Sequence, residues 1–244
     1  MGPKYQYEYD ADRVHLSANG YRRLGQKYAQ VYFQHAVQGR PFRPLQPRSV
    51  ERGATDLLVT FAVPVPPLRW DERMPAPHQG ANHPWQRGRG FEVTDAQGPV
   101  GIASIAIEGE DKVRLVLARA PSVGMTLAYA LTQDGAGAQG GLTGGRIGQL
   151  RDSDETVGYD EEAVPCAVTQ GAKVIAATAA NGFARRSLYD VVVGDGLASD
   201  TVVMARTAAQ LTLSAPWTGA SGMATVKVHN DLHNYAVQFS WTVQ

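Results

Sequence analysis

The sequence predicts a mainly β protein: an antiparallel β-sandwich with an N-terminal amphipathic helix and an inserted or appended β-module. Two observations predict this fold. Apolar residues recur at spacings of three and four only near the N-terminus, as they do on one face of a helix. From residue 49 onward the chain instead consists of short runs rich in β-branched residues, which Gly, Pro and Asp separate at regular intervals.

The predicted helix begins at Ser17, whose hydroxyl can cap it, and ends near Ala36. One face of this helix carries mainly aromatic side chains, here called the aromatic stripe: Tyr21, Leu24, Tyr28, Val31, Tyr32 and His35. Such a stripe needs a partner surface, which the following domain, another subunit or a separate chain would supply. Together with the residues before it, the helix makes up a first segment, 1–37. The segment 38–48 is rich in proline, which ends helices, so we expect a linker there.

Two sets of strands are expected after the linker. The sandwich should occupy residues 49–159, with runs at 56–64, 101–108, 112–118 and 125–131, and a closing strand within 232–244. Residues 160–231 would then be an inserted β-module that leaves the sandwich and returns to it. Strands of this module are expected at 164–168, at 173–178, and within 189–203 and 209–219.

Charge and cysteine content exclude several classes of function. Lys plus Arg and Asp plus Glu both number 23, so no net field would attract nucleic acid or an anionic membrane. No apolar run reaches the length of about 18 residues that a membrane-spanning helix needs. The single cysteine, Cys166, excludes an intrachain disulfide and gives no metal-ligand spacing, so we expect it to be buried. No metal and no cofactor are expected.

A short motif before the helix points to acid–base chemistry. Asp12 and His15 could form the pair in which a carboxylate orients one imidazole nitrogen, while the other nitrogen takes a proton from a serine hydroxyl. The residues on either side of this pair have a distinctive pattern: Gly2-Pro3-Lys4-Tyr5 before it, then Leu16-Ser17, Gly20-Tyr21, Leu24-Gly25 and Tyr28-Ala29 after it.

This block resembles the closing segment of the SGNH (GDSL-like) serine hydrolases. The resemblance implies that Asp12 and His15 correspond to the acid and base of an esterase triad. That family places its serine in a Gly-Asp-Ser segment, which this sequence does not contain. The triad is therefore incomplete, and we expect this chain alone to be inactive.

Two further resemblances concern the β regions. Gly90-Phe91, 109–113, Tyr129-Ala130, 148–153 and the closing segment resemble the β-domain that follows the catalytic core in sialate O-acetylesterase-like SGNH proteins. Within residues 189–214, a Gly-x-Gly-Leu turn followed by Thr-Val-Val and Leu-Thr-Leu-Ser resembles a small β-module of bacteriophage tail-fibre and tailspike proteins.

Aromatic and planar side chains near two turns are candidates for contact with a glycan or a partner protein. The first group combines Trp85 with Asn82, Arg87 and Arg89, which provide a flat apolar face and planar hydrogen-bonding groups. Trp217, at a Pro-Trp-Thr-Gly turn, is the second candidate. For both tryptophans the alternative is a ring that plugs the end of a β-structure.

These observations predict a bacteriophage tail protein, located in the virion, that is structural or binds a receptor and retains an esterase remnant without its serine. Its partners would be a host cell-surface polysaccharide or other virion proteins. Assembly as a homo-oligomer, with a trimer favoured, would cover the aromatic stripe. The alternative is the C-terminal portion of a carbohydrate O-acetylesterase whose nucleophile lies upstream or on another chain, in a secreted or cytoplasmic bacterial protein.

Overall fold

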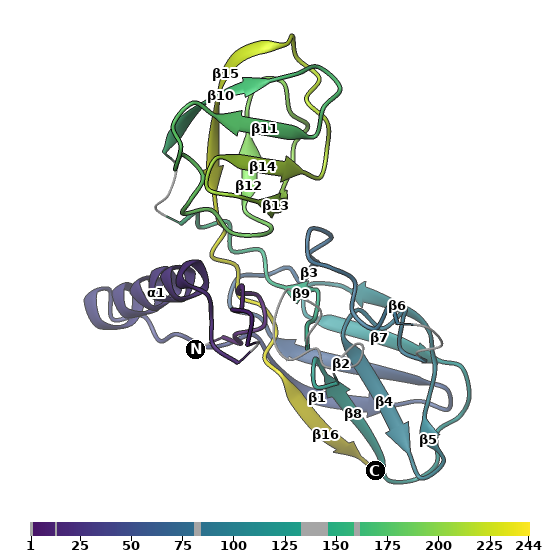
Figure 1. The fold of residues 1–244 in the computed structure, drawn as a ribbon. Helices are drawn as coiled ribbons and strands as arrows, with labels where there is room; N and C mark the ends of the chain where they lie inside the picture. The colour runs from purple at the N-terminus through teal and green to yellow at the C-terminus, as the bar shows by residue number, and fades with distance from the viewer. Residues whose placement is uncertain (1, 13, 81–83, 133–145, 159–161) are drawn as a thin grey trace. The chain divides into compact units, whose positions relative to one another are not determined.

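A computed structural model describes residues 2–12, 14–80, 84–132, 146–158 and 162–244. It confirms the expected fold class, because the chain is mainly β with antiparallel sheets and one N-terminal helix (Figure 1). The chain divides into two compact units. Unit 1 consists of Met1–Leu16, Tyr28–Asp154 and His233–Gln244, and unit 2 consists of Ser17–Lys27 and Glu155–Leu232.

Unit 1 contains two four-stranded sheets, in the orders β1-β2-β7-β6 and β16-β8-β4-β5, and a short pair, β3-β9. The first sheet consists of β1 (Gln46–Arg52), β2 (Asp56–Ala62), β7 (Lys112–Leu117) and β6 (Ile102–Glu108). The second consists of β16 (Phe239–Val243), β8 (Met125–Tyr129), β4 (Phe91–Asp95) and β5 (Gly98–Pro99). The pair is β3 (Arg69–Trp70) with β9 (Leu150–Arg151).

Aromatic side chains from both four-stranded sheets form the core of unit 1. Phe61 on β2 meets Phe91 on β4 and Phe239 on β16 edge-to-face, each with ring centroids 6.3 Å apart. Phe91 also packs against Tyr129 of β8 at 4.8 Å. These geometries are the favoured ones for aromatic pairs. The inward face of each sheet therefore packs on the other, as in a β-sandwich.

Strand β1 already begins at Gln46, inside the segment 38–48 that we expect to be a linker. The second residue of this strand is Pro47, which has no N–H to donate. It is accommodated because β1 lies at the edge of its sheet, and because the pairing with β2 shifts between Pro47 and Ser49. The prolines of segment 38–48 predict a linker up to residue 48, but the strand begins two residues earlier because an edge strand accepts Pro47.

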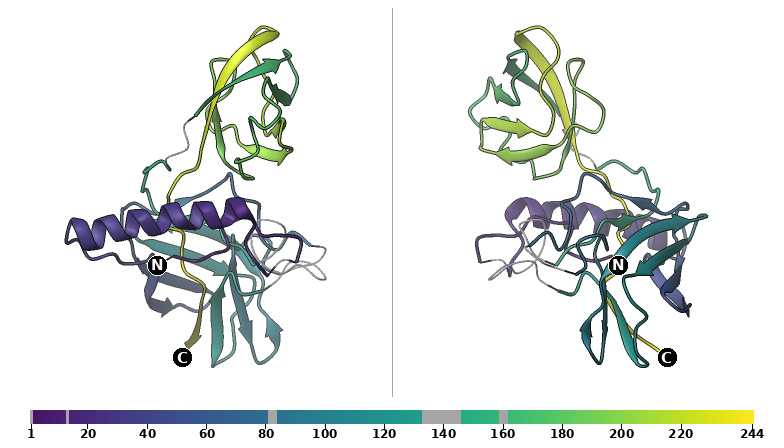
Figure 2. Two further views of the ribbon diagram at one scale, coloured as in Figure 1. Left: turned by 60° about the vertical axis from the view of Figure 1, so that its left-hand side comes forward. Right: turned by 90° about the vertical axis from the view of Figure 1, so that its right-hand side faces the viewer.

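Unit 2 contains a six-stranded antiparallel sheet in the order β12-β15-β10-β11-β14-β13. Its strands are drawn in green to yellow in Figure 2. Its strands are β10 (Ala163–Val168), β11 (Val174–Ala177), β12 (Val191–Val193), β13 (Val203–Arg206), β14 (Gln210–Leu213) and β15 (Gly222–His229). An antiparallel bridge between Val191 and Val202 joins the two edges. The backbone N–H of Val203 also donates to the carbonyl of Asp190 at 3.0 Å. The sheet therefore closes on itself as a small barrel.

Inward-facing side chains from most of these strands fill the barrel. Ile175, Leu211 and Val226 come from strands and Phe183 from a turn, and all four are fully buried. Cys166 on β10 is also fully buried among them as a free thiol, which confirms its expected position. The residue pattern does not predict the long strand β15, because only Val226 and Val228 of its eight residues are buried. Two alternating valines give a weak strand signal.

The helix forms where it is expected. Helix α1 (Ala18–Tyr32) begins after Ser17, whose hydroxyl accepts a hydrogen bond from the Gly20 N–H at 3.1 Å. A π-helical turn, Phe33–Val37, continues it to its end. No helix in the described part of the chain is long and apolar enough to cross a bilayer.

The buried side of α1 is mainly polar and belongs to unit 2. Asn19 Nδ2 donates to the carbonyl of Arg186 at 2.8 Å, and Lys27 Nζ donates to the carbonyl of Leu232 at 2.6 Å. Of the aromatic stripe, Leu24 is buried with this polar side, whereas the tyrosines are exposed. Tyr21 is 53% exposed and Tyr32 is 68% exposed. The β-structure that follows the helix therefore does not cover these rings.

Candidate functional site

The loop before α1 holds Asp12 in a fixed position. Tyr9 and Leu16 form an antiparallel bridge at the base of this loop, and the Asp10 N–H donates to the carbonyl of His15 at 2.8 Å. Asp12 Oδ1 accepts two backbone hydrogen bonds, from the N–H of Val14 at 2.9 Å and from that of His15 at 3.0 Å. The carboxylate thus stabilises its own turn through one oxygen.

The other oxygen of Asp12 faces the imidazole of His15. Asp12 Oδ2 lies 2.6 Å from His15 Nδ1, and both side chains are exposed. The hydrogen bond from the His15 ring, with the backbone bonds of His15 and Val14, lowers the pKa of Asp12 to about 2. The same hydrogen bond, with the negative charge of Asp12, raises the pKa of His15 above its usual 6.5. These are the electrostatics of an acid–base pair in which the carboxylate favours the imidazolium.

Among the described residues, no hydroxyl is hydrogen-bonded to His15 to complete a triad. Within the described ranges, the side-chain hydrogen bonds of the His15 ring go to Asp12, which leaves Nε2 as the available proton acceptor. Ser153 lies in an Arg-Asp-Ser-Asp segment that superficially suggests a nucleophile. However, its Oγ donates to the carbonyl of Pro67 at 2.7 Å and accepts from Arg69 Nε at 2.9 Å. Its proton is therefore committed to a carbonyl and not to an imidazole.

A titration would test the pair directly. We expect the His15 imidazole to titrate above pH 6.5, and the Asp12→Asn variant to titrate closer to 6.5, because the variant lacks the negative charge. The contribution of His15 to stability is present below pH 6.5 and is lost as the pH rises through its raised pKa. The contribution of Asp12 is present above pH 3.8 and is lost as the pH falls towards 2. NMR of the imidazole C–H signals measures the midpoint, and equal midpoints in both proteins would contradict the geometry.

Trp85 lies in the core of unit 1. Its ring is 6% exposed, packs edge-to-face on His78 at 5.7 Å, and donates its N–H to the carbonyl of Val93 at 3.0 Å. The neighbouring arginines are also engaged. Arg87 donates to the carbonyl of Ala103, and Arg89 pairs with Glu72 at 2.7 Å and stacks over the ring of Trp70. Asn82 lies outside the described residues. The Trp85 ring therefore fills part of the interior of unit 1, as in the alternative stated above, and does not face solvent.

Trp217 lies in the core of unit 2. It is 5% exposed, and its indole N–H donates to the carbonyl of Ala220 at 3.1 Å. The ring occupies a slot made by glycines, since a Cβ at Gly196 would lie only 2.4 Å from it, and one at Gly219 3.0 Å. The ring face is covered by the protein itself.

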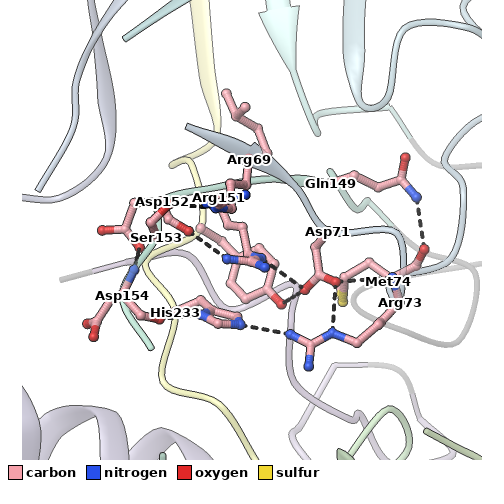
Figure 3. Close-up of polar contacts among 12 residues, drawn as sticks. Arg69, Asp71, Arg73, Met74, Gln149, Arg151, Asp152, Ser153, Asp154 and His233 are labelled. Atoms are coloured by element: carbon pink, nitrogen blue, oxygen red, sulfur yellow. Dashed lines mark hydrogen bonds and ion pairs between the residues drawn. The ribbon is translucent and has the colours of Figure 1, made fainter. Parts of the chain in front are cut away.

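A buried polar network ties β3 and β9 to the returning segment before β16 (Figure 3). The buried carboxylate of Asp71 accepts hydrogen bonds from Tyr235 Oη and from Arg73 Nε. Arg73 Nη2 also lies 2.7 Å from His233 Nε2, and His233 Nδ1 bonds to the carbonyl of Asp154. Both ring nitrogens of His233 are thus occupied, so this network positions backbone segments and holds no free base. Sequence reasoning misses it because its members lie up to 164 residues apart.

A second polar site lies in a cleft of about 330 Å³ in unit 1. It is here called the arginine cleft, because three arginines and several apolar side chains form its wall. The segment before β1 and the end of β2 contribute most of this wall, and Asp154 and Asn234 complete it. The lining residues are Gln34, Arg40, Pro41, Phe42, Arg43, Arg48, Ala62, Val63, Pro64, Val65, Asp154 and Asn234.

Side chains that could hold a metal do not gather in the described part of the chain. No group of three or more His, Cys, Asp or Glu side chains in those residues is placed to bind an ion. His229 lies 3.4 Å from Asp231, and His233 contacts Arg73.

Comparisons with known proteins do not identify a family. No protein-family profile and no curated protein matches the chain. Among solved structures, the N-terminal part of the bacterial S-layer protein SbsC aligns with 92% of this chain and 50% of its own length, at 11% identity and a TM-score of 0.27. A longer structure of the same S-layer protein aligns with 91% of this chain and 29% of its own length, at 12% identity and a TM-score of 0.28. The chain therefore spans half or less of these proteins, and TM-scores this low do not identify a shared fold.

Proposed function

We propose that this chain carries the acid–base part of a serine esterase that acts on carbohydrate esters, joined to two β-units. The observation that carries the proposal is the 2.6 Å contact between Asp12 Oδ2 and His15 Nδ1 in a loop that fixes the carboxylate through backbone N–H groups. The resemblance of the surrounding residues to the SGNH closing block supports this assignment.

In this reaction, His15 Nε2 takes the proton of a serine hydroxyl as the serine oxygen attacks the ester carbonyl. Asp12 stabilises the imidazolium that forms, which then gives its proton to the leaving alcohol. Water repeats the sequence on the acyl-serine and releases the acid. The serine belongs to another polypeptide segment, and the aromatic stripe offers a surface on which that segment can pack.

The experiment measures hydrolysis of p-nitrophenyl acetate. The chain alone should show no turnover above that of free imidazole. The proposal requires that the flanking DNA encode a polypeptide with a Gly-Asp-Ser segment, and its absence there would count against the proposal. After mixing or fusion with that polypeptide, hydrolysis should appear, and His15→Ala should reduce it by about 10³-fold or more. Asp12→Asn should also lower the rate. Asp10→Asn, in the same loop, is the control and should lower it much less, because the charge of Asp10 affects the pKa of His15 less than that of Asp12 does. An inactive mixture, or a rate that His15→Ala does not change, would refute the proposal.

A role in a bacteriophage tail, as a structural or glycan-binding component, is the second candidate. The observation that favours it is the uncovered part of the aromatic stripe. There, Tyr28, Val31, Tyr32 and His35 border, with Phe42, a hollow of about 430 Å³. Burying each large apolar side chain contributes about 1.5 to 3 kcal/mol, so assembly of identical chains through this surface would be stabilised. The resemblance to tail-fibre modules favours a trimer.

Light scattering on the purified chain checks this assembly. We expect a trimer at micromolar concentration. The double variant Tyr28→Ser/Tyr32→Ser should be a monomer, because it removes apolar surface that the assembly would bury. It should still fold, because both rings are exposed in the single chain. Val123→Ser, which removes another highly exposed apolar side chain, should remain trimeric. A monomeric wild-type chain would count against the tail role.

A further inference from the structure

Two segments that connect unit 1 to unit 2 pair with each other through backbone hydrogen bonds. They are here called the ribbon and comprise residues 154–158 and 230–233. The chain leaves unit 1 along the first segment and returns to it along the second. Within the ribbon, the Leu232 N–H donates to the carbonyl of Thr156 at 2.8 Å. At the unit 1 end, the imidazole of His233 continues this pairing, because its Nδ1 bonds to the carbonyl of Asp154. A side chain therefore closes the end of the ribbon.

The partners of His233 determine its protonation state. Arg73 Nη2 lies 2.7 Å from His233 Nε2 (Figure 3). A guanidinium has only N–H donors and stays protonated in proteins, so His233 Nε2 has to accept and carries no proton. The carbonyl of Asp154 can only accept, so the proton of the imidazole lies on Nδ1. The two contacts together therefore require a neutral imidazole in this tautomer.

We propose that protonation of His233 opens the ribbon at its unit 1 end, so that the connection between the two units loosens in mild acid. An added proton on Nε2 would point an N–H at the donors of Arg73 and would place two positive charges in contact. Imidazole is the side chain whose charge ordinarily changes between about pH 5 and 8. The contact with Arg73 is therefore present at neutral pH and is lost as the pH falls.

Arg73 is the partner that stays in place. Its backbone N–H and its Nε both donate to Asp71 Oδ1, at 3.1 and 3.2 Å. The imidazolium therefore turns away from Arg73, and the carbonyl of Asp154 loses its donor. Opening ends at the next pair of residues, because the Asp152 N–H donates to the carbonyl of Asn234 at 3.0 Å. The change is thus confined to the point where the ribbon leaves unit 1.

The carboxylate of Asp71 attracts the imidazolium, but both of its oxygens already accept hydrogen bonds, from Arg73 and from Tyr235. Burial raises the pKa of Asp71, but the charge of Arg73 and the hydrogen bond from Tyr235 hold it below its usual value. Asp71 therefore keeps its charge in mild acid, and the imidazole is the group that changes. The ionisable groups that face or flank His233 are Asp71, Arg73, Arg151, Asp152, Asp154, Tyr235, His229 and Asp231.

Amide hydrogen exchange of the intact chain tests the proposal, at about pH 7.5 and about pH 5, on either side of the range in which imidazole titrates. The rates are corrected for the intrinsic effect of pH on exchange. We expect the protection of the Leu232 N–H to fall by about tenfold or more at the lower pH, because the ribbon frays from the end that has lost its closing hydrogen bond. Amides of strand β8, in the core of unit 1, should keep their protection.

Three variants separate the titration of His233 from other causes. His233→Gln removes the titrating group, so Leu232 should have equal protection at both pH values, whatever its level. His229→Gln changes another histidine near the ribbon and is the matched control, which should respond as the wild type does. In Arg73→Gln, the side-chain amide can donate to a neutral imidazole or accept from an imidazolium, so the ribbon should stay closed at both pH values.

Three results would overturn the proposal. The first is a wild-type chain in which Leu232 has the same protection at both pH values. The second is a fall that persists in His233→Gln, since another group would then cause it. The third is a fall in Arg73→Gln as large as in the wild type, because the conflict of charges would then have no effect. The measurement involves no hydrolysis, so its outcome is independent of the esterase proposal.

Discussion

Trp217→Ala is expected to destabilise unit 2 by about 3 to 5 kcal/mol, the usual cost of removing a large aromatic side chain from a packed core. The ring is 5% exposed and occupies a slot formed by Gly194, Gly196 and Gly219. Backbone surrounds much of this slot and cannot collapse onto it, so the variant retains a cavity. The carbonyl of Ala220 also loses its indole donor.

Amide hydrogen exchange of strands β10 and β15 measures this effect separately from unit 1. Met223→Ala is the matched control, because Met223 lies on β15 but is 65% exposed. We expect it to change stability by about 0.5 kcal/mol at most. A loss below about 1 kcal/mol in Trp217→Ala would show that the ring is not part of the barrel core.

Asp152→Ala is the second large effect, and we expect it to destabilise unit 1 by about 3 kcal/mol or more. The carboxylate is fully buried and accepts hydrogen bonds from the backbone N–H groups of Val65, Asp154 and Asn234, each at 3.1 Å. It also accepts one from Asn234 Nδ2 at 2.7 Å. Hydrogen bonds to a charged group contribute about 1.5 to 3 kcal/mol each, and here four donors lose their acceptor together.

Urea denaturation followed by circular dichroism gives the free energy of unfolding. Asp152→Asn should give an intermediate loss, because it keeps one of the two acceptor oxygens. Glu110→Ala removes an exposed carboxylate from the same unit and should be nearly neutral. If Asp152→Ala matched this control, the carboxylate would not hold these segments together.

Local patterns predict much of the fold. The runs at 56–64 and 164–168 become β2 and β10, since alternating burial along a strand produces alternating residue types. Strands β1 and β15 are missed for the opposite reason. Strand β1 lies at a sheet edge and so accepts Pro47, which is otherwise typical of a linker. Strand β15 buries only two of its eight side chains, so its sequence does not need to be apolar.

The same distinction applies to the sites. Asp12 and His15 are three positions apart, so a turn is enough to bring them together and the sequence shows the pair. Arg48 and Asn234 reach one cleft only through the fold of unit 1, which no local pattern encodes. Trp85 and Trp217 show a further limit: a tryptophan near a turn has the same local sequence whether its ring plugs a core or faces solvent.

The closure of the unit 2 sheet restricts how a partner can bind it. An open sheet has unpaired backbone groups along its edges, and these can recruit a strand from another chain. In unit 2, the bridge between Val191 and Val202 joins β12 to the segment that leads into β13, so the edges pair with each other. Strand addition is therefore disfavoured there, and a partner has to recognise side chains and turns. In unit 1, by contrast, β1 and β6 end one four-stranded sheet, and β16 and β5 end the other, without a further strand among the described residues. An added strand could pair at these edges.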